Sequence, residues 1–290
     1  MMRAAVLAAV LVPLCALGAA GCIAKRTPAW AAPPTPFGAV SEQILQDLAA
    51  DGDKAWKARA DKDQLDEAAR AYAAVLRYNP SDAGVLVRLG RVAMRRAATT
   101  DRGAGAAERL NEATAYAERA LAVRNPALLA AARTKGAVPG DVFSHAEPAD
   151  APALALYAEA LLGWSVAHGT GTVLKQRDWI AAAATRALGF DPAVGWAAPN
   201  RVLGTLDCEL PSARENLRDA LVRFEAAVAA APAYLPTRVA YATEYATRMR
   251  DDELYRRLLQ EVIGADPKAF PDAAPENVEA QKAARKLLGR

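Results

Sequence analysis

A recurring helix-ending pattern is the feature that most constrains the fold of this 290-residue chain. Apolar residues recur three and four positions apart, β-branched residues are sparse, and alanine, leucine and arginine are abundant, as in amphipathic helices. Five helical segments run into a proline, at Pro80, Pro126, Pro192, Pro232 and Pro267. Because proline lacks the backbone N–H that a helix interior needs, each one should end a helix and redirect the chain. The body of the chain should therefore be almost entirely helical.

Three of the helices that end at these prolines share a spacing of small and aromatic residues. The spacing reads Ala68-x3-Tyr72, Ala113-x3-Ala117-x2-Ala120 and Ala220-x3-Phe224-x2-Ala227. It resembles the second helix of a tetratricopeptide repeat, where alanines allow close approach and an aromatic ring fills the gap between paired helices. The intervals between prolines are uneven, so insertions should interrupt a regular array. We predict an all-α fold of degenerate tetratricopeptide-like helical hairpins that form a superhelix or bundle; a generic alanine-rich bundle is the alternative.

Glycines in the other helices indicate where paired helices approach closely. The candidates each follow a leucine, at Leu89-Gly90, Leu162-Gly163 and Leu203-Gly204. Glycine, proline and aspartate concentrate over residues 137–152, which we predict to be a long loop within one helical domain spanning residues 41–290.

The first 22 residues resemble the export signal of a bacterial lipoprotein. Arg3 precedes an uncharged run, which ends in Ala19-Ala20-Gly21-Cys22 and is similar to a lipobox. We predict that residues 1–21 are a signal peptide and that Cys22 is lipidated, which would anchor the protein to a membrane. An ordinary leader cut after Ala31 is the alternative. Because Ile23 follows the cysteine, where an aspartate would signal retention at the inner membrane, the resemblance favours the periplasmic side of the outer membrane.

Residues 22–40 should connect the lipid to the helical domain. This segment contains Pro28, Pro33, Pro34 and Pro36 and has no apolar periodicity. We therefore predict a proline-rich, extended tether.

Composition and spacing argue against several kinds of chemistry. The formal net charge is +3 and no long run of one sign occurs, so we expect no nucleic-acid binding. His145 and His168 lie far apart in sequence and no Cys/His set has zinc spacing, so we expect no metal and no cofactor.

Cys208 has no intrachain partner for a disulfide, because Cys15 leaves with the signal peptide and Cys22 is lipidated. No nucleophile or phosphate-loop motif occurs, so we predict a protein that is not an enzyme; a cell-wall hydrolase would need a carboxylate pair that the sequence does not indicate.

Aromatic residues concentrate between the predicted loop and Leu203. Aromatic rings with a few polar groups suit a concave, partly apolar binding site. Core packing is the alternative for each ring taken singly. We predict that the ligand-binding residues are Tyr157, Trp164, His168, Trp179, Trp196 and Asn200.

The C-terminal half resembles the T component associated with tripartite ATP-independent periplasmic (TRAP) transporters, the TatT family. The resemblance is carried by the segments 156–164, 203–204, 220–227, 238–242, 252–262 and 277–288. It implies a periplasmic lipoprotein of degenerate tetratricopeptide repeats, a homotrimer with a pore or cavity in each subunit, and a TRAP solute-binding protein as partner. The chain departs from the family over residues 195–200, where a glycine-rich stretch is expected.

These observations predict a non-enzymatic periplasmic accessory lipoprotein of a TRAP-type transport system. It would dock the solute-binding protein and hold a small apolar or anionic ligand. The alternative is a scaffold lipoprotein in outer-membrane or envelope assembly, which would bind a protein or peptide on the concave face of the repeats.

Overall fold

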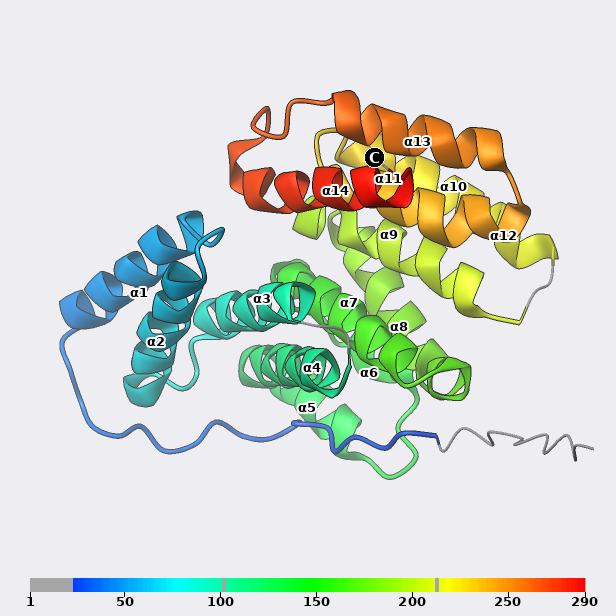
Figure 1. Cartoon of the computed structure of the whole chain (residues 1–290). Coiled ribbons are helices and arrows are strands. Elements are labelled where there is room, and N and C mark those ends of the chain that lie inside the picture. The colour runs from blue at the N-terminus through cyan, green and yellow to red at the C-terminus, as the bar shows by residue number, and fades with distance from the viewer. Residues whose placement is uncertain (1–22, 101–102, 212–213, 290) are drawn as a thin grey trace, which may run out of the picture.

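The computed structural model shows an all-α protein, as the sequence predicts (Figure 1). It describes residues 23–100, 103–211 and 214–289; within these ranges there is no strand, and no helix is both long and apolar enough to cross a bilayer. The predicted signal peptide, residues 1–21, and Cys22 lie outside the described residues. The helical elements, in chain order, are α1 (Glu42–Lys57), α2 (Lys62–Tyr78), α3 (Ala83–Thr99), α4 (Ala104–Arg124), α5 (Pro126–Arg133), α6 (Pro139–Ser144), η1 (Pro148–Asp150), α7 (Ala151–Ala167), α8 (Thr170–Phe190), α9 (Val194–Glu209), α10 (Arg214–Ala230), α11 (Pro236–Ala240), η2 (Tyr241–Ala246), α12 (Thr247–Met249), α13 (Asp252–Gly264), η3 (Pro271–Ala273) and α14 (Ala274–Leu287).

Consecutive helices pack as antiparallel hairpins. The pairs α1–α2, α3–α4, α7–α8 and α9–α10 pack closely, and neighbouring hairpins meet where α4 and α9 each contact α7. In the last hairpin α13 packs against a continuous helix made of α11, η2 and α12, whose middle turn is π-helical, and α14 covers both. This arrangement confirms the predicted fold class.

The predicted proline ends are confirmed. A helix stops two or three residues before each of the five prolines, at Tyr78, Arg124, Phe190, Ala230 and Gly264. Three helices begin with a side-chain cap: Asp61, Asp82 and Asp251 accept hydrogen bonds from backbone amides in the first turns of α2, α3 and α13. These caps satisfy amides that have no partner within the helix.

The aromatic positions of the repeat pack against glycines of the paired helix. Tyr72 and Phe224 are fully buried, and a β-carbon on Gly52 would lie 2.5 Å from the Tyr72 ring. A β-carbon on Gly204 would lie 3.1 Å from the ring of Phe224. Each of the predicted close-contact glycines packs against a side chain of another helix; these are Gly90, Gly163 and Gly204.

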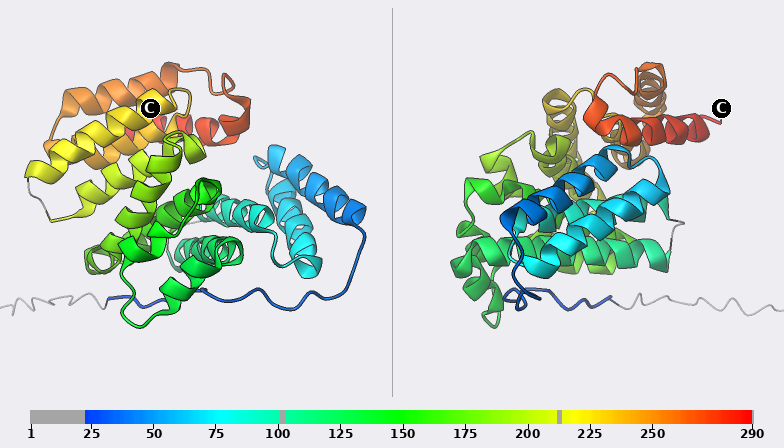
Figure 2. Two further views of the ribbon diagram at one scale, coloured as in Figure 1. Left: turned by 180° about the vertical axis from the view of Figure 1, so that it is seen from behind. Right: turned by 90° about the vertical axis from the view of Figure 1, so that its left-hand side faces the viewer.

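Residues 23–40 are extended and lie along the helical domain, and we call them the N-terminal strap (Figure 2). The amide of Ala24 donates to the hydroxyl of Thr172 on α8 (3.2 Å). Arg26 donates to both carboxylate oxygens of Glu118 on α4, at 2.5 and 3.0 Å, and the amide of Ala29 donates to the same carboxylate. The first third of the strap is therefore fixed to the domain by buried polar contacts.

The segment 137–152, predicted as a loop, contains two short helical elements, α6 and η1. The buried carboxylate of Asp150 organises it, because it accepts from Arg124 and from the amide of Glu147, both at 2.9 Å.

Candidate ligand site

Three consecutive residues at the start of α9 have a left-handed backbone. The φ angles of Gly195, Trp196 and Ala197 are 59°, 59° and 61°. This conformation costs an L-residue roughly 1–2 kcal/mol, and such strain is often found at binding sites. The turn brings the Trp196 indole onto the ring of Tyr234, with centroids 4.8 Å apart and planes inclined by 27°. The regular part of α9 follows, with Pro199 in its first turn.

Arg201, one turn into the regular part of α9, connects this aromatic pair to α7. Its guanidinium donates to the carbonyl of Trp196 (3.0 Å) and to the carboxylate of Glu159 (2.7 Å). It also lies over the Tyr234 ring, 5.0 Å from the centroid. Burial raises the pKa of Tyr234, so its phenol stays neutral at physiological pH.

The loop that carries Tyr234 is held by a fully buried amide on α14. The Asn277 side chain accepts from the amide of Leu235 (2.9 Å) and donates to the carbonyl of Ala233 (2.9 Å). Asn277 therefore fixes the residues on both sides of Tyr234. The position of the Tyr234 ring thus depends on how α14 packs.

A second buried arginine joins the N-terminal hairpin to α14. Arg59, in the turn between α1 and α2, donates to both oxygens of Glu276 at 2.9 and 2.6 Å. The same guanidinium donates to the carbonyl of Asp272 and lies over the Trp56 ring. These contacts bring elements from opposite ends of the sequence together beside Tyr234.

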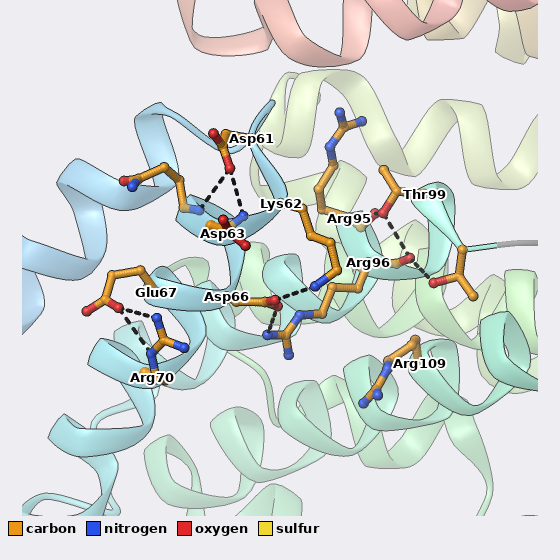
Figure 3. Close-up of polar contacts among 12 residues, drawn as sticks. Asp61, Lys62, Asp63, Asp66, Glu67, Arg70, Arg95, Arg96, Thr99 and Arg109 are labelled. Atoms are coloured by element: carbon orange, nitrogen blue, oxygen red, sulfur yellow. Dashed lines mark hydrogen bonds and ion pairs between the residues drawn. The ribbon is translucent and has the colours of Figure 1, made fainter.

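The side chain of Arg95 on α3 points toward the same place, but its hydrogen-bond donors are not all paired there. Its side chain extends toward the C-terminal helices, away from the ion pair that Arg96 makes with Asp66 (Figure 3). It is only 7% exposed, its Nε has no hydrogen-bond partner, and the nearest carboxylate oxygen, on Glu276, is 3.9 Å away. A buried guanidinium with an unused donor costs free energy, so its presence calls for an explanation.

Arg91, one turn before Arg95, is a second arginine whose charge is not paired within the described part of the chain. It forms no ion pair with any residue that the structure describes. Its side chain is exposed at the surface. The protein atoms around the guanidinium still remove part of its hydration, which lowers its pKa, and the nearby Glu159 opposes that change. We call Arg59, Arg91, Arg95 and Arg201 the arginine cluster.

The arginine cluster has more positive charge than its carboxylates neutralise. Glu276 is shared between Arg59 and Arg95, and Glu159 is bound by Arg201 with Arg91 nearby. Glu159 is one-third exposed, although most of α7 is buried, so water reaches the cluster. Surplus cations beside an aromatic pair, with access from solvent, can bind a small anion.

The structure divides the predicted ligand-binding residues among three places. Trp196 and the buried Asn200 belong to α9 at the arginine cluster. Tyr157 and Trp179 lie elsewhere, each within 7 Å, ring to ring, of the Trp30 indole of the strap. Trp164 and His168 form a separate pair at the end of α7; the rings are 4.5 Å apart and His168 Nδ1 is 2.8 Å from the Trp164 carbonyl.

The arginines are the residues that sequence reasoning missed. In the sequence they resemble the solvated cations of amphipathic helices, and nothing marks them as neighbours. Only the departure from the family pattern over residues 195–200 indicated that this part of α9 is unusual. In the described part of the chain, no group of three or more His, Cys, Asp or Glu side chains is arranged to hold a metal ion.

Comparison with family models gives one match. Residues 104–290 match the model described as TRAP transporter T-component, and no curated protein matches the chain. The matched region contains Trp196, Arg201, Tyr234 and Glu276, whereas the remaining three members of the arginine cluster lie before it.

Proposed function

The chain belongs to the TRAP transporter T-component family, as its sequence resemblance predicted, and has an accessory role in TRAP transport. From this premise we propose that it docks the solute-binding protein of the transporter and holds a small organic anion at the arginine cluster. In this role the protein binds its ligand and performs no chemistry on it.

The observation that carries the ligand proposal is the buried, partly unsatisfied guanidinium of Arg95 beside Arg91. Guanidinium groups bind carboxylates and phosphates through paired, charge-assisted hydrogen bonds. A ligand oxyanion at Arg95 and Arg91 would supply both the missing acceptor and the missing negative charge. The Trp196–Tyr234 pair offers an apolar surface for the carbon skeleton of the ligand.

The setting of the protein in the cell is proposed from the family and the leader. We propose a periplasmic location and lipid attachment at Cys22, to the outer membrane. A homotrimer is proposed from the family resemblance alone; light scattering of the lipid-free chain tests it, and a stable monomer would contradict it.

Calorimetric titration tests the ligand proposal. The probes are glutarate, its uncharged counterpart glutaramide, and inorganic phosphate, each titrated at low and high salt. We expect glutarate to bind and glutaramide not to bind, with weaker binding at high salt because the contacts are ionic. Phosphate binding as strong as that of glutarate would show that the site selects the oxyanion and not the carbon skeleton.

Variants of the arginine cluster make the titration specific. Arg95→Gln and Arg91→Gln should each weaken glutarate binding by roughly tenfold or more, because each removes a charge-assisted hydrogen bond. Arg70→Gln is the matched control, since it removes an equal charge from an exposed pair on α2. No glutarate binding to the wild type, or equal affinity in all three variants, would overturn the proposal.

A pull-down tests the partner. Tagged protein from detergent-solubilised envelope should recover a TRAP solute-binding protein, identified by mass spectrometry. Recovery of outer-membrane or cell-wall assembly proteins in its place would favour the scaffold function.

A further inference from the structure

The strap reaches the helical domain at the turn between α7 and α8. Ile23, the first residue that the structure describes, directly follows Cys22 in the sequence. A β-carbon on Gly171 would lie 3.5 Å from the side chain of Ile23, and the next amide, that of Ala24, binds Thr172. Cys22 is therefore joined directly, in the sequence, to a residue that contacts the start of α8.

Exposed apolar side chains occur at Ile23 and on both sides of the α7–α8 turn that it contacts. Ile23, Val166 and Leu174 are 50%, 42% and 43% exposed, and Val166 and Leu174 flank the α7–α8 turn. Single exposed apolar residues are common on protein surfaces, but grouped ones often mark an interaction site. Three of the nine large apolar residues that are exposed in the described part of the chain occur at this one turn.

A cavity lined by cationic side chains lies beside the first half of α8. It has a volume of about 310 Å³ and lies between the strap and α5, α7 and α8; its lining includes Lys25, Arg26, Trp30, Lys175 and Trp179. The buried Glu118 neutralises Arg26, whereas the two lysines form no ion pair with any residue in the described ranges.

The nearest acidic residue along α8 does not neutralise the two lysines. It is Asp178, the first acidic residue after Lys175, and it pairs with Arg177 at 3.0 Å. Lys25 and Lys175 are exposed, whereas the aromatic rings of the lining are buried or half-buried, so the lysines are the groups that can reach lipid headgroups. We call Ile23, Lys25, Val166, Leu174 and Lys175 the anchor face.

We propose that the anchor face binds the surface of a bilayer that contains anionic phospholipid, with Lys25 and Lys175 at the headgroup phosphates and the three apolar side chains among the acyl chains. This position of the bilayer, next to Ile23, depends on the proposed acylation of Cys22. An acyl chain on Cys22 and the anchor face would meet the membrane together, so the strap fixes the orientation of the domain. The C-terminal helices α13 and α14 lie on the side of the molecule opposite the strap and would face away from the membrane (Figures 1 and 2).

Vesicle sedimentation tests this inference independently of acylation. The chain from residue 22 carrying Cys22→Ser, which cannot be acylated there, is mixed with vesicles of phosphatidylglycerol and phosphatidylcholine or of phosphatidylcholine alone. We expect binding to the anionic vesicles only, with a decrease at high salt. Replacing both lysines, Lys25→Gln with Lys175→Gln, should weaken binding about thirtyfold, from the usual contribution of a lysine near an anionic surface.

Apolar variants and controls complete the test. Leu174→Ser should weaken binding further, whereas Val222→Ser, at an exposed site on α10, and Lys57→Gln, at the end of α1, should leave it unchanged. Circular dichroism confirms that each variant is folded. Failure of the wild type to bind anionic vesicles, or equal loss in the controls, would overturn the proposal; failure of Cys22 to incorporate a labelled fatty acid in cells would overturn only the anchor.

Discussion

Arg26 and Glu118, 92 residues apart in the sequence, form an ion pair of two hydrogen bonds in which the side chains are 5% and 0% exposed. A buried pair of this kind is costly to break from one side, because the remaining charge loses its partner. The pair is therefore a principal contact between the strap and the domain.

Replacing the acidic partner should release the strap. In Glu118→Ala the strap can detach and carry Arg26 into water, so we expect a loss of up to about 3 kcal/mol in the free energy of unfolding. Trypsin should then cleave after Lys25 and Arg26 much faster than in the wild type, as followed by mass spectrometry. Glu112→Ala, which removes a surface carboxylate from the same helix, is the control. Equal cleavage of the two variants would show that the pair does not hold the strap.

The strap illustrates what the sequence could and could not predict. Its prolines and lack of apolar periodicity indicated an extended tether, and residues 23–40 form no helix or strand. Its attachment depends on Glu118, which lies in α4 among the alanines of a repeat and resembles any surface glutamate in the sequence. A contact between residues so far apart is set by tertiary packing, which local patterns do not encode.

The fold itself was largely predictable, because helix periodicity and proline ends are local signals. Gly52 was not identified from the sequence, although it packs against Tyr72 in the way that Gly204 packs against Phe224. The candidate site was predicted only at Trp196 and Asn200. Its cations come from α3, α9 and the α1–α2 turn, and their convergence is a property of hairpin packing.

Removing the unsatisfied cation should stabilise the protein without ligand. Arg95→Met keeps a long side chain but eliminates a buried charge whose Nε lacks a partner, so we expect a gain of about 1–2 kcal/mol in urea denaturation. A residue kept at the cost of stability is typical of a functional site.

The neighbouring arginine provides the control for this prediction. Arg96 pairs with Asp66 at 2.5 Å, so Arg96→Met should be neutral or slightly destabilising. If Arg95→Met were the more destabilising of the two, Arg95 would be a structural residue and the ligand proposal would lose its main support.

Asp207 on α9 should make stability depend on pH. Burial, with a smaller contribution from the nearby Asp219, raises the pKa of Asp207 to about 6, and Arg223 opposes the change. The folded state thus binds the proton more tightly than the unfolded state. The ionised carboxylate therefore lowers the free energy of unfolding above about pH 6, and this loss disappears as the pH falls toward about 4. Asp207→Asn should be more stable than the wild type at about pH 7.5 by about 1 kcal/mol, a value reduced because the side chain is partly exposed.

Denaturation across this pH range checks the effect. The difference between Asp207→Asn and the wild type should shrink steadily between about pH 6 and pH 4. Asp178→Asn, at a well-exposed carboxylate on α8, should show no such trend. A difference that stays constant with pH would exclude titration of Asp207 as its cause.

Cys208 should be inert in the folded protein. It is 1% exposed in the C-terminal core, and burial raises the pKa of its thiol to about 12, so almost no thiolate is present at neutral pH. In a chain from residue 22 carrying Cys22→Ser, maleimide should label Cys208 at least about a thousandfold more slowly than in the unfolded chain, because only opened molecules react. Labelling in guanidinium chloride gives the reference rate. Rapid labelling of the native protein would instead reveal an accessible thiol and reopen the question of a nucleophile in this fold.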